Sequence, residues 1–203
     1  MDNVSDAEIL ELTKQLRVAY ALKRTLRFSM PRDLSVHSES VAEHVFALFF
    51  LAQYFLPLED SARMLDRERI YQMILYHDFG EITHGDVPYH RKTAEHEARE
   101  KDAAQGVFAS LPASIANTGL ERWKEYETRT SKEAKFVYAL DKLEPMFELF
   151  DPISEKTMKR TKFTFTDHIV RKRRATEDFP VMRRFVEVVS EEMRKRDIFW
   201  PES

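Results

Sequence analysis

The segment Ile74–Pro88 reads ILYHDFGEITHGDVP. An apolar helical pattern runs into it, and His77 shares the face of Met73 and Ile74 because residues three and four positions apart are neighbours on a helix. Asp78 follows directly, and two glycines and two more carboxylates come within nine residues of His77. A helix end alone does not need this set of residues, so the segment is the first candidate for a functional site.

Composition predicts an all-α protein. The chain has 203 residues, of which 43% are hydrophobic and 12% aromatic, enough to bury a sizeable core in one domain. It has only four glycines, whereas about 14 would be average for this length. Few glycines mean few sharp turns, and apolar residues recur at helical spacing along the chain.

Several classes of function are disfavoured. The formal charge of -3 gives no overall attraction to nucleic acid or anionic lipid, and the absence of cysteine excludes disulfides, thiolate catalysis and Cys-based zinc sites. The acidic, amphipathic start MDNVSDAEILELTKQL does not resemble a signal peptide. No apolar run approaches the ~20 residues that span a bilayer. We therefore expect a cytoplasmic protein with neither a nucleic-acid polymer nor a membrane as partner.

The periodic segments predict helices at 9–23, 41–56, 60–78, 91–111, 120–127, 132–150 and 179–196. Ser40 followed by Glu43 is the signature of a capping box, and Asp60 or Ser61 is expected to open the third helix. Pro57 is expected to end the second helix, and Pro145 to kink or end the sixth. The segment 151–176 is hard to interpret, and its charge run RKRR at 171–174 is expected to be solvated.

Two more polar residues lie on apolar helical faces. His44 shares its face with Val41 and Leu48, and Asp141 shares its face with Val137. A buried histidine is commonly just a satisfied core residue, but buried carboxylates are rare unless they are paired, hydrogen-bonded or bound to metal. A divalent cation held by two His and two Asp would account for all of them and keep positions open for water and substrate.

These residues lie in sequence segments that resemble those of a known family. ESVAEH (39–44), YHDFGEITHGDVP (76–88) and AKFVYALDKLE (134–144) are similar to the H…HD…D signature of HD-domain metal-dependent phosphohydrolases. They look most like its 5′-deoxynucleotidase branch, as does LKRTLR at 22–27. The resemblance implies a single HD domain over 1–203, a helical bundle with a core at about 22–149 and a C-terminal helical extension at about 150–203.

The resemblance also implies roles for individual residues. His44, His77, Asp78 and Asp141 match the metal ligands, with Asp78 also beside the substrate. Glu81 matches the carboxylate that activates or orients the attacking water, and Asp86 matches a second acidic residue at the sugar and phosphate. Arg27 matches a phosphate-binding arginine. Phe28 takes the place of an aromatic residue that orients phosphate, and Tyr89 lies in a stretch that lines the nucleotide.

The implied activity is release of phosphate from nucleoside 5′-monophosphates, most of all the deoxy forms, with one divalent ion (Co, Mn, Zn, Fe, Ni or Mg) as cofactor. Two alternatives stay open. The substrate could be another phosphoester, such as a cyclic or pyrophosphorylated nucleotide, or the chain could be a regulatory protein that binds metal or nucleotide without turnover. Family members are often dimers, so a homodimer is expected. The sequence assigns no role to His84.

Overall fold

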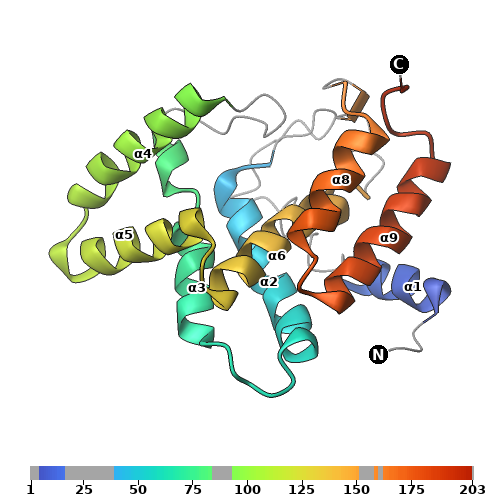
Figure 1. Ribbon diagram of the computed structural model, residues 1–203, viewed down its shortest axis with the longest axis horizontal. Coiled ribbons are helices and arrows are strands. Elements are labelled where there is room, and N and C mark those ends of the chain that lie inside the picture. The colour runs from blue at the N-terminus through green and yellow to red at the C-terminus, as the bar shows by residue number, and fades with distance from the viewer. Residues whose placement is uncertain (1–4, 17–38, 84–92, 151–157, 160–161, 203) are drawn as a thin grey trace, which may run out of the picture. The chain divides into compact units, whose positions relative to one another are not determined.

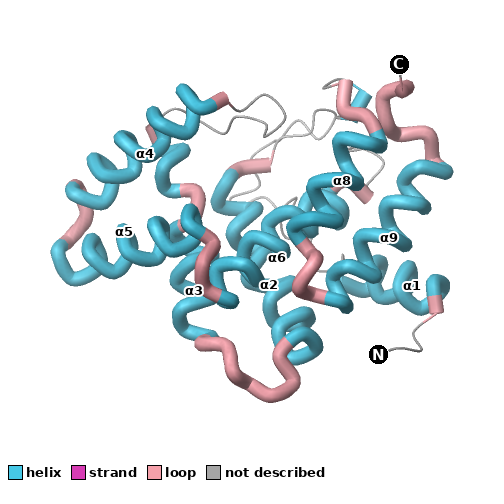
Figure 2. The backbone as a smooth tube through the Cα atoms, in the orientation of Figure 1, coloured by secondary structure: helices cyan, strands magenta, loops and turns pink. Residues whose placement is uncertain are grey.

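The computed structural model describes residues 5–16, 39–83, 93–150, 158–159 and 162–202. Within these ranges the regular elements are helices, as Figures 1 and 2 show, and the all-α prediction is confirmed. The described ranges contain no strand, although Thr164 and Trp200 form an isolated β-bridge. In chain order the elements are α1 (Asp6–Leu16), α2 (Val41–Glu59), α3 (Arg67–Tyr76), the 3₁₀ helix η3 (Phe79–Ile82), α4 (Ala94–Ala109), α5 (Ala113–Thr128), α6 (Lys132–Glu148), α8 (Phe165–Ala175) and α9 (Pro180–Lys195).

The chain divides into two compact units. The first combines Met1–Ser61 with Ala139–Ser203, and the second is Ala62–Tyr138. The chain leaves the second unit inside α6, which therefore contributes residues to both. The single domain expected over 1–203 stays a prediction.

The core of the first unit is built on aromatic rings. Phe55 of α2, Phe147 of α6 and Phe185 of α9 contact one another, with ring centroids 5.0 to 6.3 Å apart. All three side chains are at most 2% exposed. Aromatic pairs of this kind contribute about 0.5–1.5 kcal/mol beyond the area that they bury. Helix α9 also contacts α1 and α8, and its buried side chains are Met182, Phe185, Val186, Val188, Val189, Ser190 and Met193.

The second unit packs α3 against α5 and η3 against α4. Its core cluster contains Tyr76, Phe108 and Trp123, which are all buried. Gly119 of α5 lies directly against this cluster, because a Cβ built there would approach the Phe108 ring to 2.7 Å. This core fixes the end of α3, where Tyr76 immediately precedes His77.

The predicted start of α2 is confirmed, and the predicted start of α3 is not. Ser40 begins α2 as predicted, and its hydroxyl accepts from the Glu43 amide while the Glu43 carboxylate accepts from the Ser40 amide. The start predicted at Asp60 or Ser61 is wrong. Asp66 opens α3 instead, and its carboxylate accepts from the Arg69 amide. Both aspartates suit an N-cap by residue type, so the sequence alone did not separate them.

Neither proline ends its helix. Helix α2 continues through Pro57 to Glu59, and α6 continues through Pro145 to Glu148. Both prolines lie within four residues of a helix end, so only a short piece of each helix follows the missing N–H donor. The helix predicted at 120–127 is longer: α5 begins at Ala113 and continues through Gly119, which packs closely against Phe108.

The C-terminal region that was hard to interpret contains α8. Thr164 caps it, with Asp167 completing a capping box, so the alternating FTFT at 163–166 begins a helix. The expectation that the basic run at 171–174 is solvated is wrong for Lys172, which is only 5% exposed. It lies on the inner face of α8 together with His168 and Ile169, so helical position outweighs local charge.

Helix α2 corrects one expectation about membranes. By length and composition alone it is long and apolar enough to cross a bilayer, contrary to the reading that no run approaches that length. Core helices of soluble proteins pass the same test. Six of its side chains are buried within the protein: Ala47, Leu48, Leu51, Ala52, Phe55 and Leu56.

Candidate metal centre

His77 follows the last residue of α3 and is held from two sides within the second unit. Its Nδ1 lies 3.0 Å from the carbonyl oxygen of Ile74, which can only accept a hydrogen bond, so Nδ1 donates. The Tyr126 ring meets the imidazole edge-on, with centroids 5.1 Å apart. The neutral ring then carries its proton on Nδ1 and its lone pair on Nε2. This tautomer can bind a metal ion through Nε2.

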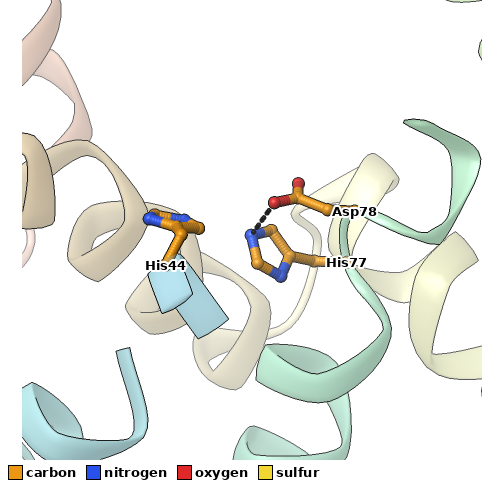
Figure 3. Close-up of side chains that lie close together, drawn as sticks. All are labelled: His44, His77 and Asp78. Carbon is orange, nitrogen blue, oxygen red and sulfur yellow. Dashed lines mark ion pairs between the residues drawn. The ribbon is translucent and has the colours of Figure 1, made fainter. Parts of the chain in front are cut away.

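Asp78 is placed by a change of helix type. The α-helix predicted to reach Asp78 ends at Tyr76, and Asp78 becomes the residue that opens η3. Its Oδ2 lies 3.1 Å from His77 Nε2, and Figure 3 shows the carboxylate turned toward the imidazole. Two adjacent residues thus present a nitrogen and an oxygen at one point.

Glu81 lies in η3, the short helix that follows Asp78. Its amide donates to the Asp78 carbonyl oxygen at 2.9 Å. A 3₁₀ helix has three residues per turn, so Asp78 and Glu81 share a face. Gly80 between them permits close approach to α4, because a Cβ there would lie 3.1 Å from the Glu100 carbonyl oxygen. Glu81 is partly exposed, as a group that meets solvent and substrate requires.

His44 lies in the first turn of α2 and contacts two carboxylates of α6, all in the first unit. Its Nδ1 lies 3.0 Å from Glu144 Oε2, and its Nε2 lies 3.4 Å from Asp141 Oδ1. The imidazole is 15% exposed, Asp141 12% and Glu144 1%. Since a carboxylate can only accept, Nδ1 donates to Glu144, and Nε2 is again the nitrogen beside an aspartate.

Asp141 is oriented by its neighbour in sequence. Lys142 Nζ donates to Asp141 Oδ2 at 2.7 Å, which leaves Oδ1 on the side of His44. Sequence reasoning missed both Lys142 and Glu144. The spacing of Asp141 and Glu144, three residues apart on one apolar helix, was the available signal for Glu144.

Charge in the first unit favours a cation. Burial lowers the pKa of His44, but hydrogen bonds and charge from Asp141 and Glu144 outweigh it and raise that pKa well above the usual value. The two carboxylates thus favour positive charge at this ring, and a cation on Nε2 would supply that charge in place of a proton, so its binding would be linked to pH.

The donor atoms fit a transition-metal ion. With metal–ligand distances of about 2.0–2.2 Å, two ligands at right angles lie about 3 Å apart. The two His–Asp pairs show nitrogen–oxygen distances of 3.1 Å, at His77 and Asp78, and 3.4 Å, at His44 and Asp141. Each pair has its histidine Nδ1 engaged and its Nε2 beside a carboxylate oxygen. Imidazole and carboxylate ligands suit Mn, Fe, Co, Ni and Zn.

A further acidic residue lies near His44. Ligand atoms of Glu39, His44 and Glu144 lie within 4.8 Å of one another, all within the first unit. Behind α6, the buried Lys172 of α8 donates to the carbonyl oxygen of Lys142. The first unit therefore places two lysines, Lys142 and Lys172, close enough to interact with Asp141.

The remaining predicted site residues lie outside the described part of the chain. They are the phosphate and nucleotide contacts and the second acidic residue: Arg27, Phe28, Asp86 and Tyr89. His84 and Gly85 also lie outside it. Their roles stay predictions.

Comparison with known proteins identifies a family and several relatives. The family profile of the HD domain matches residues 19–183. The chain is 30% identical to the 5′-deoxynucleotidase HDDC2 of Homo sapiens over 139 residues, which cover 68% of this chain and 66% of the relative. It is 33% identical to the HDDC2 protein of Danio rerio over 135 residues, covering 66% of this chain and 65% of the relative. The chain thus spans about two thirds of the length of these curated relatives.

One solved structure is similar over nearly the whole chain. It is that of a predicted metal-dependent phosphohydrolase from Magnetospirillum magnetotacticum MS-1. The two share 28% sequence identity with a TM-score of 0.70, and the alignment covers 95% of this chain and 98% of the other.

Proposed function

Because the chain belongs to the HD-domain family, we propose that it is a metal-dependent phosphohydrolase that releases phosphate from nucleoside 5′-monophosphates, with deoxynucleotides as preferred substrates. The observation that carries this proposal is the pair of His–Asp arrangements, each with Nε2 beside a carboxylate oxygen. The relatives named 5′-deoxynucleotidase and the solved phosphohydrolase support the same reaction class.

We assign His44, His77, Asp78 and Asp141 to one divalent cation. Each pair is already prepared within its own unit, because Ile74 and Glu144 hold the Nδ1 atoms. The bound cation would act as a Lewis acid, which polarises a phosphoryl oxygen and offsets the negative charge of the transition state. The chain's own residues have to supply orientation and proton transfer.

Glu81 is assigned as the general base. It sits on the same face of η3 as Asp78 and is partly exposed, so its carboxylate can accept a proton from the attacking water. The P–O bond to the 5′ oxygen breaks as the new P–O bond forms, and the products are inorganic phosphate and a nucleoside. Asp86 is proposed to orient the sugar and phosphate, and Arg27 to bind phosphate oxygens through its two-pronged guanidinium.

The test is phosphate release from a panel of nucleotides. Protein stripped with EDTA is assayed with Mn²⁺, Co²⁺ or no metal on deoxy- and ribonucleoside 5′-monophosphates, 3′-monophosphates and cyclic nucleotides. We expect release from 5′-monophosphates, fastest with deoxyribose, only when metal is present. Metal-dependent thermal stabilisation without release from any substrate would instead favour a regulatory binding protein.

Assembly and location stay predictions. We propose a cytoplasmic homodimer, in line with the composition and with the family resemblance. Light scattering of the purified protein measures the mass directly, and a fluorescent fusion reports the location. A monomer across the micromolar range would contradict the first prediction, and membrane association the second.

A further inference from the structure

Glu144 is the most deeply buried carboxylate at the candidate centre, with a side chain only 1% exposed. It lies on α6 one turn after Asp141, and its Oε2 is 3.0 Å from His44 Nδ1. No role for it follows from the H…HD…D signature, which ends at Asp141.

The contact has a defined chemical consequence. An imidazole that donates from Nδ1 to a carboxylate is held in one tautomer and one orientation, and its Nε2 becomes a stronger ligand. For His44, this directs Nε2 to the same side as Asp141 Oδ1, 3.4 Å away. His77 has the weaker version of this arrangement, because its Nδ1 donates to the neutral carbonyl of Ile74.

A buried carboxylate needs compensating charge. Beyond His44, the first unit supplies Lys172, whose buried ammonium donates to the Lys142 carbonyl oxygen and is attracted by both Asp141 and Glu144. Helix α8 thus places a cation behind the part of α6 that carries the two carboxylates. This offsets the cost of holding Glu144 ionised away from water.

We propose that Glu144 is a positioning residue that fixes the tautomer and orientation of His44 for metal binding. The proposal rests on the metal centre assigned above. It adds to that assignment a residue that does not touch the ion and acts through His44.

The test compares Mn²⁺ affinity by isothermal titration calorimetry of the full chain after EDTA stripping. Glu144→Leu keeps a side chain of similar bulk but removes the hydrogen-bond acceptor. We expect it to raise the Mn²⁺ dissociation constant by about 10–100-fold. Glu144→Gln keeps an amide oxygen that can accept from Nδ1 without charge, and a smaller loss is expected. In the metal-free protein Glu144→Leu should lower the melting temperature, because it removes the partner of His44 and a carboxylate that interacts with the buried Lys172, and Glu144→Gln should lower it less.

The matched control is Glu148→Leu, which removes another buried carboxylate one turn further along α6. Its Mn²⁺ affinity should equal that of wild type. An equal loss in the control would overturn the proposal, as would unchanged affinity in Glu144→Leu. If the leucine variant does not fold, unchanged affinity in Glu144→Gln overturns it.

Two further results would distinguish the positioning role of Glu144 from the metal centre on which it depends. A loss greater than about a thousandfold in Glu144→Leu would exceed the range for a supporting residue and make Glu144 a ligand, which overturns the positioning role. A wild-type protein that binds no Mn²⁺ would overturn the metal centre itself, whereas equal affinity of wild type and Glu144→Leu overturns only this inference.

Discussion

The amide of Glu81 donates to the carbonyl oxygen of Asp78 at 2.9 Å, which closes one 3₁₀ turn between a proposed metal ligand and the proposed base. The bond joins main-chain atoms, so it fixes the separation of the two residues without using either side chain. Their roles can therefore be tested separately.

Glu81→Gln is expected to lower kcat by about 10²–10⁴-fold, because an amide cannot accept the proton of the attacking water. Mn²⁺ should still raise the melting temperature as in wild type, since the four proposed ligands are intact. Steady-state phosphate release and a thermal shift assay measure the two quantities. Wild-type kcat in this variant would show that Glu81 is not the base.

His44→Ala is expected to abolish both turnover and the thermal shift caused by Mn²⁺, because it removes one of four ligands. Asp78→Asn should have a similar effect on affinity, since the neutral amide is a poorer ligand for a divalent ion. His96→Ala is the control, because His96 caps α4 through Thr93 and has no role in the centre. Retention of full metal-dependent activity by His44→Ala would remove it from the ligand set.

Arg27→Ala tests a residue outside the described ranges. We expect a higher KM for deoxynucleoside monophosphates, because a bidentate contact to phosphate is lost. Arg27→Lys should recover only part of it, since an ammonium lacks the planar fork of the guanidinium. Initial rates over a range of substrate concentrations give the answer, and an unchanged KM in the alanine variant would place the phosphate elsewhere.

Lys172 gives a pH dependence of stability. Burial, with a smaller effect of Lys142, lowers its pKa to about 7 in the folded protein, whereas the unfolded value is near 10.4. Between these values the unfolded chain binds more protons, so this residue makes the free energy of unfolding rise with pH, by at most about 1.4 kcal/mol per pH unit. Below pH 7 both states are protonated and the burial penalty is present in full.

Lys172→Met removes this dependence. The stability of the variant relative to wild type should therefore be greatest at pH 6.5 and should decline toward pH 9.5. Urea denaturation of both proteins at several pH values measures the difference. A difference that is constant across the range would mean that Lys172 does not titrate there.

Two glycines in the second unit provide a matched pair for packing. Gly119→Ala is expected to destabilise by about 1–3 kcal/mol, because the new Cβ would lie 2.7 Å from the buried Phe108 ring. Gly106→Ala in α4 meets no atom within 4 Å and should stabilise by about 0.5–1 kcal/mol through helix propensity alone. Urea unfolding of both variants is the measurement, and equal effects would contradict the close packing at Gly119.

The sequence singled out the histidines and aspartates of the proposed centre for a physical reason. His44 and Asp141 are polar residues on otherwise apolar helical faces, and that contrast is visible in the periodicity alone. Glu144 was missed because it follows two charged residues in the segment DKLE (141–144), and a glutamate in such a segment is usually exposed to solvent. Only the fold shows that it is buried against His44.

The same limit applies to Lys172 and to the start of α3. Four consecutive basic residues look solvated, but α8 turns one of them inward against the Lys142 carbonyl. Asp60 and Asp66 both suit an N-cap by residue type, but Asp60 is the C-cap of α2, which continues to Glu59, and Asp66 is the N-cap of α3. Local sequence patterns predicted the all-α class and the start of α2. They did not predict the burial of Lys172, which depends on a contact between α8 and α6.

The capping box at Ser40 has a consequence for metal exchange. His44 stands in the first turn of α2, and first turns are where helices fray. Reciprocal bonds between Ser40 and Glu43 hold that turn closed, so the imidazole is preorganised before any ion arrives. Less conformational entropy would then be lost when the proposed ion binds, which favours its affinity.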